Sequence, residues 1–311
     1  MKKSIGIVGA GLIGRAWAIV FARAGHPVML TDIDAAALAR SHALIGERLK
    51  DLKDFGLITE SPAQVLERIT CTDSLAAAVK GAALVQENVR ETLQAKREIF
   101  ASLDTLCPAD CVIASSTSWI PASQYTEGLA GRGRCLVAHP TNPPYLIPLV
   151  ELCPAPWTTP ASVARARDLY AGAGQQPVTL SREIHGFLLN RVQGAVLNEC
   201  FNLYAQGLAS AEDIDKVLKE GLALRWSFMG PFETIDLNAP AGIADYAARY
   251  GGANRELAQA HAPFAWDADT MTRIEAERRT RLGEDQLEAR AQWRDRRLMA
   301  LMAHKRGAPD K

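Results

Sequence analysis

A histidine and a glutamate in the middle of the chain have the types and spacing of an acid–base pair. His139 ends an apolar run, Cys135–Ala138, that is typical of a short buried strand, and prolines directly after it exclude a helix or a regular ladder strand. A second apolar run, Leu149–Leu152, brings Glu151 back towards the same place. An imidazole backed by a carboxylate can act as a general base near neutral pH. Taken alone, the stretch fits a surface histidine beside a proline-rich turn equally well.

A glycine-rich turn near the N-terminus is typical of dinucleotide binding. An apolar run, Ile5–Val8, leads into Gly9-Ala10-Gly11-Leu12-Ile13-Gly14, and a helical pattern then stops at Gly25. In this motif the first glycine makes the tight turn, the second lets a pyrophosphate approach the backbone, and the third lets helix and strand pack closely. The N–H groups and the dipole at the helix N-terminus favour the phosphates.

The residues after the next predicted strand indicate which dinucleotide is bound. Val28–Thr31 forms that strand, and Asp32 closes it. A carboxylate there accepts hydrogen bonds from the adenosine ribose hydroxyls and repels a 2′-phosphate. No arginine follows in Ile33-Asp34-Ala35 to bind such a phosphate. The sequence therefore predicts NAD rather than NADP as the cofactor.

The first half of the chain alternates between strand and helix patterns, which predicts a Rossmann-type doubly wound sheet of the α/β class. The further elements we expect are helix 35–55, strand 69–72, helix 73–80, strand 83–87, helix 93–106, strand 111–114 and a last strand at 177–180. From Gly186 onwards the pattern is helical. We therefore expect an NAD-binding domain over residues 1–185 and an all-α C-terminal domain for substrate binding and dimerisation over residues 186–311.

A polar cluster follows the predicted strand at 111–114. Ser115-Ser116-Thr117-Ser118 falls at the carboxyl edge of the sheet, where open α/β sheets bind ligands and where the glycine loop, Asp32 and His139 also end. On its own the cluster could equally be a helix cap before Pro121. Its position on the same edge as His139 favours a functional role.

Two polar residues of the second half stand among apolar ones. Asn190 shares helical spacing with Phe187, Leu197 and Phe201, so its amide either ties two helices together or binds a ligand oxygen. Arg225 lies between large apolar residues and should pair with a carboxylate of the protein or of the substrate. The charged stretch from 278 to 305 carries apolar residues suited to docking on a partner subunit or on the body of the protein.

Composition and charge exclude several classes. The chain has 311 residues, a formal net charge of +0 and 23% charged residues, so no basic field indicates nucleic acid or membrane binding. No apolar run is long enough to cross a bilayer, and the N-terminus lacks the features of a signal peptide. The six cysteines show no metal-site spacing, and we expect no metal. They are expected to be reduced in a cytoplasmic protein.

With these residues in view, the chain resembles the 3-hydroxyacyl-CoA dehydrogenase superfamily over nearly its whole length, and within it the branch of L-gulonate 3-dehydrogenase and λ-crystallin. The segments that carry the resemblance are Gly9–Gly14 with Asp32, Gln86-Glu87, Ser115–Ser118, His139–Tyr145, Ile147–Leu152, Gly186–Arg191, Gly230-Pro231 and Gln292–Asp295.

The resemblance implies roles for individual residues. His139 would take the hydroxyl proton while Glu151 holds its ring, and Ser118 and Asn190 would hydrogen-bond the substrate oxygen during hydride transfer. Glu91 and Lys96 match positions that contact the nicotinamide-side ribose, and Asn142 matches another position near the cofactor. The resemblance also implies a homodimer through the helical half.

Two departures bear on the substrate. The chain lacks the C-terminal motif typical of the acyl-CoA branch, and its histidine loop carries extra prolines. We therefore expect a free 3-hydroxy acid such as L-gulonate, with Arg225 as a candidate carboxylate clamp. The alternatives are L-carnitine, with an aromatic cage from Trp119, Tyr145, Trp226 and Phe228, a short 3-hydroxyacyl-CoA, or a crystallin-like structural protein that binds NAD without turnover.

Overall fold

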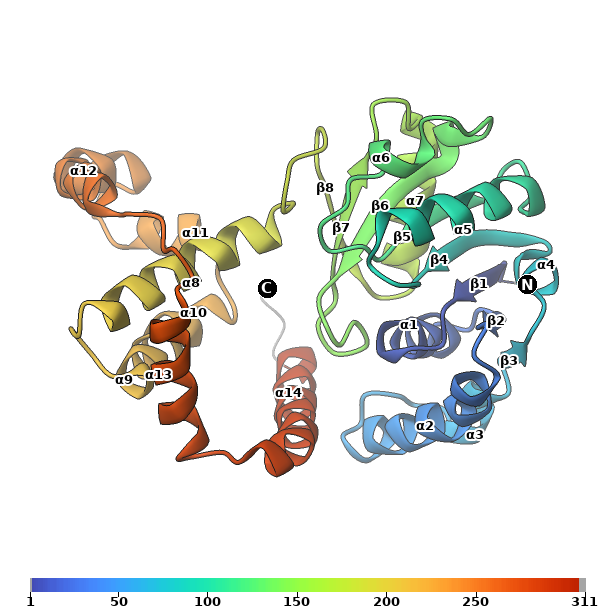
Figure 1. Ribbon diagram of the computed structural model, residues 1–311, viewed down its shortest axis with the longest axis horizontal. Coiled ribbons are helices and arrows are strands. Elements are labelled where there is room, and N and C mark those ends of the chain that lie inside the picture. Colours follow the sequence, from blue (N-terminus) through green and yellow to red (C-terminus); the bar gives the residue numbers. More distant parts are fainter. Residues whose placement is uncertain (1, 308–311) are drawn as a thin grey trace. The chain divides into compact units, whose positions relative to one another are not determined.

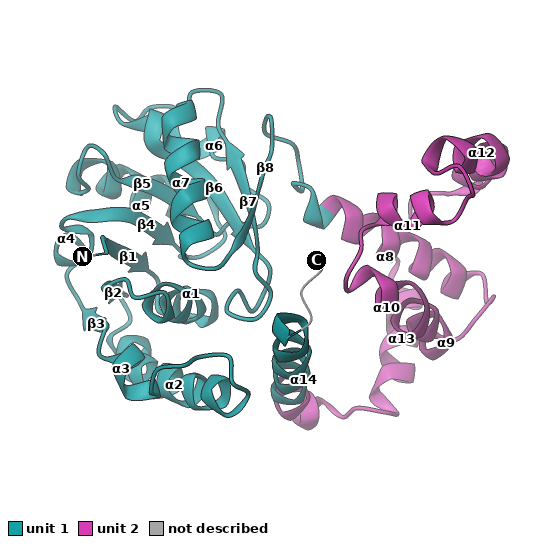
Figure 2. Ribbon diagram, turned by 180° about the vertical axis from the view of Figure 1, so that it is seen from behind, with its two compact units in different colours: residues 1–190, 292–308 teal, residues 191–291, 309–311 magenta. Residues whose placement is uncertain are grey.

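The computed structural model describes residues 2–307, which divide into two compact units (Figures 1 and 2). The first comprises residues up to 190 together with 292–307, and the second comprises residues 191–291. This division differs from the predicted one at the C-terminus, because the last helix groups with the first unit rather than with the helical domain.

An eight-stranded sheet forms the centre of the first unit, in the order β3-β2-β1-β4-β5-β6-β7-β8. The strands are β1 (Ser4–Val8), β2 (Val28–Thr31), β3 (Ile69–Thr72), β4 (Ala82–Glu87), β5 (Val112–Ser115), β6 (Cys135–Pro140), β7 (Leu149–Pro154) and β8 (Gln176–Thr179). Strands β1 to β6 are parallel, whereas β7 pairs antiparallel with β6. The predicted doubly wound α/β fold is confirmed.

Helices cover both faces of this sheet and bury one apolar cluster on each. One face carries α1 (Leu12–Arg23), α2 (Ala35–Asp54), α3 (Pro62–Leu66) and α7 (Pro160–Gly172). The other carries α4 (Leu75–Val79), α5 (Leu93–Leu106) and α6 (Ser123–Thr126). Alternate strand residues point into the two clusters, as in Ile113 against Ala114 of β5. Burial on both faces explains why the central strands are nearly continuous apolar runs.

The last helix, α14 (Leu287–Gly307), packs on the first unit from residue 292 onwards. Met299 is fully buried in the cluster that contains α1 and α2, with Leu298 and Met302 packed around it. Near the helix end, the Arg306 guanidinium donates to the Leu57 carbonyl at 2.7 Å. The sequence predicts that this charged stretch docks on a partner subunit or on the body of the protein. The structure shows that it docks on the body.

The second unit is helical. Its elements are α8 (Leu189–Ala205, in this unit from residue 191), α9 (Ala211–Lys216), a π-helical stretch (Val217–Leu222), α10 (Ala223–Trp226), α11 (Pro231–Leu237), α12 (Ile243–Ala260) and α13 (Ala268–Arg279). Phe201, Phe264 and Trp266 form an aromatic cluster, with ring centroids 4.6 to 6.0 Å apart. Neither α8 nor α12 contains a buried residue, and a Cβ added at Gly194 of α8 would have nothing within 4 Å.

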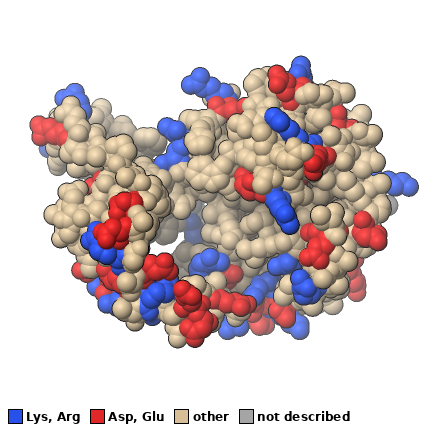
Figure 3. All heavy atoms as spheres, in the orientation of Figure 1, with Lys and Arg blue, Asp and Glu red and all other residues tan. Residues whose placement is uncertain are grey.

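The surface and the cysteines fit the composition. Acidic and basic side chains are interspersed on the face shown in Figure 3. Within residues 2–307 no helix combines the length and the hydropathy needed to cross a membrane. All six cysteines are free thiols, and four of them are buried.

Candidate active site

The glycine loop between β1 and α1 has the geometry that a pyrophosphate needs. Gly9 has φ of +97°, and a Cβ there would lie 2.7 Å from the Asn88 carbonyl oxygen. A Cβ on Gly14 would lie only 1.8 Å from the Gly9 carbonyl oxygen, whereas Gly11 has nothing within 4 Å. The first two residues of helix α1 are Leu12 and Ile13. Gly11, directly before them, has no side chain that could cap the N–H groups of the first helical turn. These donors remain available to an anion.

Asp32 lies on the wall of a cavity of about 580 Å³ that begins at this loop. Its carboxylate accepts the Ala10 N–H at 2.5 Å and the Asp34 N–H at 2.8 Å. Three more carboxylates line the cavity, those of Asp34, Asp73 and Glu98, together with one guanidinium, that of Arg90. Because the carboxylates outnumber the guanidinium, the lining opposes a 2′-phosphate, and the cavity fits the adenosine end of NAD.

His139 and Glu151 lie directly opposite each other on β6 and β7. The Glu151 Oε2 atom is 2.8 Å from the His139 Nδ1 atom, and both side chains are almost fully buried, at 6% and 2% exposure. The other carboxylate oxygen accepts the N–H groups of Leu188 and Leu189, at 2.8 and 2.9 Å. With Nδ1–H donated to the carboxylate, the lone pair of Nε2 is left free to accept a proton.

The turn before α8 aims those N–H groups at Glu151. Gly186 has φ of +76° and Phe187 has φ of +49°, an uncommon conformation for a residue with a side chain. Burial of the Phe187 ring, whose centroid lies 5.5 Å from that of His139, holds the turn in place. The sequence pattern placed the helix start at Gly186, but this turn delays it to Leu189.

Ser118 and Asn190 also meet, through the backbone of the serine. The Asn190 amide donates to the Ser118 carbonyl at 2.8 Å. The Glu91 carboxylate accepts the N–H groups of Ser118 and Trp119, at 3.0 and 3.2 Å, and the hydroxyl of Thr117. The Ser118 hydroxyl has no protein partner in the described part of the chain, so it is free to donate to a ligand.

Lys96 is buried against a protein carboxylate rather than exposed towards a cofactor. Its side chain is 1% exposed, and its ammonium lies 2.8 and 3.0 Å from the two oxygens of the buried Glu87. The closest oxygen of Glu91 is 3.8 Å away. Burial raises the pKa of Glu87, and the neighbouring Lys96 ammonium and the Ser115 hydroxyl oppose that rise. Lys96 therefore supports the turn that carries Glu91, and a direct contact with the ribose stays a prediction.

A buried polar network ties the strand ends together, and the sequence argument gave it no role. The Gln86 amide donates to the Ser116 hydroxyl at 2.7 Å and to the Ala138 carbonyl at 3.3 Å, next to His139. The Tyr170 hydroxyl donates to the side-chain amide oxygen of Gln86, and the Trp17 indole donates to the Ser116 hydroxyl at 3.0 Å. A glutamine within an otherwise apolar strand was the available signal, because a buried amide needs partners.

The remaining predicted site residues take no part in these contacts. Asn142 is exposed in the proline loop, where its peptide bond to Pro143 is cis. Arg225, in the second unit, is exposed and pairs with no carboxylate among residues 2–307. Tyr145 is 7% exposed in the core of the first unit, so it does not present a ring for a cation cage.

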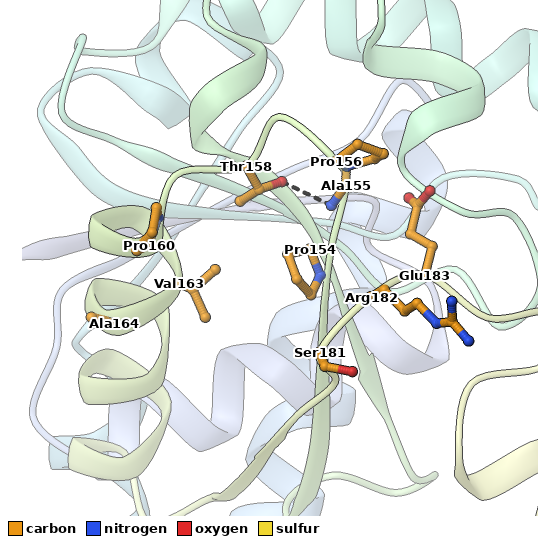
Figure 4. A pocket seen from close by; sticks show the side chains of 10 residues that line it. All are labelled: Pro154, Ala155, Pro156, Thr158, Pro160, Val163, Ala164, Ser181, Arg182 and Glu183. Carbon is orange, nitrogen blue, oxygen red and sulfur yellow. Dashed lines mark hydrogen bonds between the residues drawn. The ribbon is translucent and has the colours of Figure 1, made fainter.

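A second pocket, of about 540 Å³, lies at the other edge of the sheet, where β7 ends and β6 begins (Figure 4). Pro154 and Pro156 line it, and the Thr158 hydroxyl accepts the Ala155 N–H at 2.9 Å. It contains none of the glycine loop, His139 or Ser118, so it is separate from the candidate site.

Comparison with known proteins places these features in a family. Residues 4–184 match the NAD binding domain of 3-hydroxyacyl-CoA dehydrogenase, and residues 186–278 match the C-terminal domain of that family. A λ-crystallin homolog from Bos taurus is 40% identical over 310 residues, which cover 98% of this chain and 96% of that protein.

Two further matches come from enzymes. An L-carnitine dehydrogenase from Streptomyces griseus is 40% identical over 250 residues, which cover 80% of this chain and 74% of that enzyme. A solved 5-formyl-3-hydroxy-2-methylpyridine 4-carboxylic acid 5-dehydrogenase, described as an NAD⁺-dependent dismutase, superposes with a TM-score of 0.83. It is 27% identical, and the superposition covers 99% of this chain and 100% of that structure.

Proposed function

The chain belongs to the 3-hydroxyacyl-CoA dehydrogenase family and is an NAD-dependent oxidoreductase, and we propose that it oxidises the 3-hydroxyl of a small free 3-hydroxy acid, such as L-gulonate, to the 3-keto acid. The single observation that carries the proposal is the buried His139–Glu151 pair at the carboxyl edge of the sheet, on the same edge as the glycine loop. NAD supplies the hydride acceptor when bound.

His139 Nε2 takes the hydroxyl proton in this mechanism. Oxidation of a carbinol releases that proton as the carbon–oxygen double bond forms, so a base beside the oxygen lowers the barrier. The Glu151 carboxylate fixes the imidazole tautomer through Nδ1 and stabilises the imidazolium that results. Because Glu151 also accepts two N–H groups of the α8 turn, its own position is fixed during proton transfer.

Ser118 binds the substrate oxygen, and Asn190 positions Ser118. The free hydroxyl of Ser118 donates to it, and the Asn190 amide keeps the serine turn in place through the Ser118 carbonyl. A donor already oriented towards the developing carbonyl oxygen needs no rearrangement during reaction. Asn190 thus acts on the substrate chiefly by positioning Ser118.

A relative named as an L-carnitine dehydrogenase supports a free acid over a CoA ester, because L-carnitine is itself a free 3-hydroxy acid. Its quaternary ammonium needs an aromatic cage, but Tyr145 is buried, which weakens that assignment here. The C-terminal segment that departs from the acyl-CoA branch is used to dock α14 on the first unit.

The proposal is tested by NAD reduction with a substrate panel of L-gulonate, L-carnitine, L-3-hydroxybutyrate and 3-hydroxybutyryl-CoA. We expect the highest kcat/KM for a free acid without a quaternary ammonium. A clear preference for the CoA ester would contradict the substrate class, and preference for L-carnitine would support the runner-up.

A cytoplasmic homodimer through the second unit completes the proposal. It is supported by the apolar side chains exposed there, among them Val217, Phe232 and Leu237, each more than 60% exposed. Light scattering behind gel filtration should give about twice the chain mass of 33.7 kDa. A monomer at micromolar concentration would contradict it.

A further inference from the structure

We propose that Trp119 and His185 bind the carboxylate at the non-reacting end of the substrate, an inference that rests on the proposed function and names a specificity element for it. The two residues come from different segments of the first unit, the turn after β5 and the turn before α8. Their ring centroids lie 5.7 Å apart at an interplanar angle of 40°.

Both rings are attached to the catalytic turns. Trp119 directly follows Ser118. Its backbone N–H donates to Glu91 at 3.2 Å and to the Thr117 hydroxyl at 3.4 Å. On the other side, His185 directly precedes the turn of Gly186 and Phe187, whose buried ring packs on His139. The pair therefore moves with the residues that hold the reacting oxygen and proton.

The rings are nevertheless open to ligand. Trp119 is 50% exposed, and His185 is also exposed. In the described chain, neither the indole Nε1–H nor the imidazole nitrogens of this pair have a hydrogen-bond partner. An imidazole carries at least one N–H, so the pair, with ring centroids 5.7 Å apart, offers two donors.

The unpaired groups around the turns favour an anion. Both oxygens of Glu151 are occupied, by His139 and by the α8 turn. The Glu91 Oε1 atom accepts three protein donors, and its Oε2 atom lies 3.8 Å from the Lys96 ammonium. The two ring N–H groups have no protein acceptor in the described chain, and two donors match the two oxygens of a carboxylate. A quaternary ammonium is disfavoured, because the His185 ring already packs against the indole ring that a cation would need.

The connectivity of a 3-hydroxy acid fits this placement. Its carboxylate carbon is separated from the carbinol carbon by one methylene or substituted methylene, so the two groups bind close together. When the hydroxyl lies between His139 and Ser118, the carboxylate falls near the residue that follows Ser118. The resulting contact would select free acids over amides and esters, which carry no full charge.

The experiment compares an acid with its uncharged amide in the full-length enzyme with NAD. KM and kcat are measured for L-gulonate against L-gulonamide, and for L-3-hydroxybutyrate against L-3-hydroxybutyramide. The variants are His185→Leu, His185→Gln and Trp119→Phe, with His304→Leu on α14 as the control for loss of an exposed histidine. Cofactor affinity of each variant, measured by fluorescence, reports that it is folded.

We expect His185→Leu to raise KM for the acids by about 10- to 100-fold, the value of one charge-assisted hydrogen bond, with most of the loss in KM rather than kcat. The amides should change by less than about threefold, and His185→Gln, which retains an N–H donor, should recover part of the loss. Trp119→Phe, which replaces the indole by a smaller aromatic ring without an N–H, should follow the same acid-specific pattern.

Equal changes for acid and amide would overturn the inference, since they would show that the rings only support the fold. That result would leave the proposed function intact, because the wild-type enzyme would still oxidise the acids. Failure of the wild-type enzyme to oxidise either acid would instead overturn the proposed function, and the carboxylate site with it.

Discussion

Replacing Glu151 with glutamine tests the acid–base pair with almost no change in side-chain volume. The carboxylate accepts three hydrogen bonds, one from His139 and two from the turn before α8. A glutamine can keep its oxygen on the two N–H groups, but it then presents an NH₂ group to Nδ1. The imidazole must accept that hydrogen bond, which moves its own proton to Nε2 and removes the base.

The size of the effect follows from these contacts. Loss of a charge-assisted hydrogen bond costs about 1.5–3 kcal/mol, or about 10- to 100-fold in rate. The wrong tautomer adds to this, and in the serine protease triad the equivalent change lowers kcat by about 10⁴. We therefore expect kcat of Glu151→Gln to fall by about 10²- to 10⁴-fold. Removing the charge beside the α8 N-terminus should also lower stability, by about 0.3–2 kcal/mol.

The assay follows NADH absorbance for kcat, with NAD affinity and melting temperature measured on the same preparation. Glu67→Gln, an exposed glutamate at the end of α3, is the matched control and should behave as wild type. A Glu151→Gln enzyme that keeps kcat within about threefold of wild type would refute the tautomer argument.

Four further predictions concern the cofactor and the fold. Asp32→Ala should weaken NAD binding and raise the relative affinity for NADP, and an unchanged ratio of the two dissociation constants would place the ribose elsewhere. Lys96→Met should lower stability in urea by about 3–5 kcal/mol, because it leaves the Glu87 charge buried without its counter-ion. Met299→Ala should lower the free energy of unfolding by about 2–5 kcal/mol, because it leaves a cavity under α14. The control is a leucine-to-alanine change on the exposed face of α14. If Met299→Ala loses no more stability than this control, α14 does not dock at that residue. Burial lowers the pKa of His26 below 6.5, so the unfolded chain takes up this proton first as the pH falls. The buried neutral His26 therefore stabilises the fold above about pH 6.5, and this stabilisation is lost at lower pH. His26→Asn lacks this titrating group, so its melting temperature should fall less between about pH 7.5 and 5 than that of the wild type.

Local sequence patterns were sufficient for the sheet and the glycine loop. Apolar runs of four to six residues between helical patterns gave most of the strands within one or two residues, because strands buried on both faces must be continuously apolar. The contact between His139 and Glu151 could also be predicted, since a short proline-rich loop returns the chain beside the strand that it has just left.

Contacts that depend on tertiary packing could not be predicted in the same way. The left-handed conformation of Phe187 is stabilised by burial of its ring near His139, and nothing in the local sequence requires it. The charge of Lys96 gave no indication that it would be buried against Glu87 rather than face a ligand. The docking of α14 depends on a few apolar residues, chiefly Met299, in a highly charged helix.

The most direct test of the account is NAD reduction by His139→Asn with the best free acid of the panel, beside NAD affinity. Removing the base at the end of β6 should lower kcat by about 10²- to 10⁴-fold while the dissociation constant of NAD stays within about threefold, because the glycine loop and Asp32 are untouched. Turnover that is undiminished in this variant would contradict the central claim that His139 accepts the substrate proton.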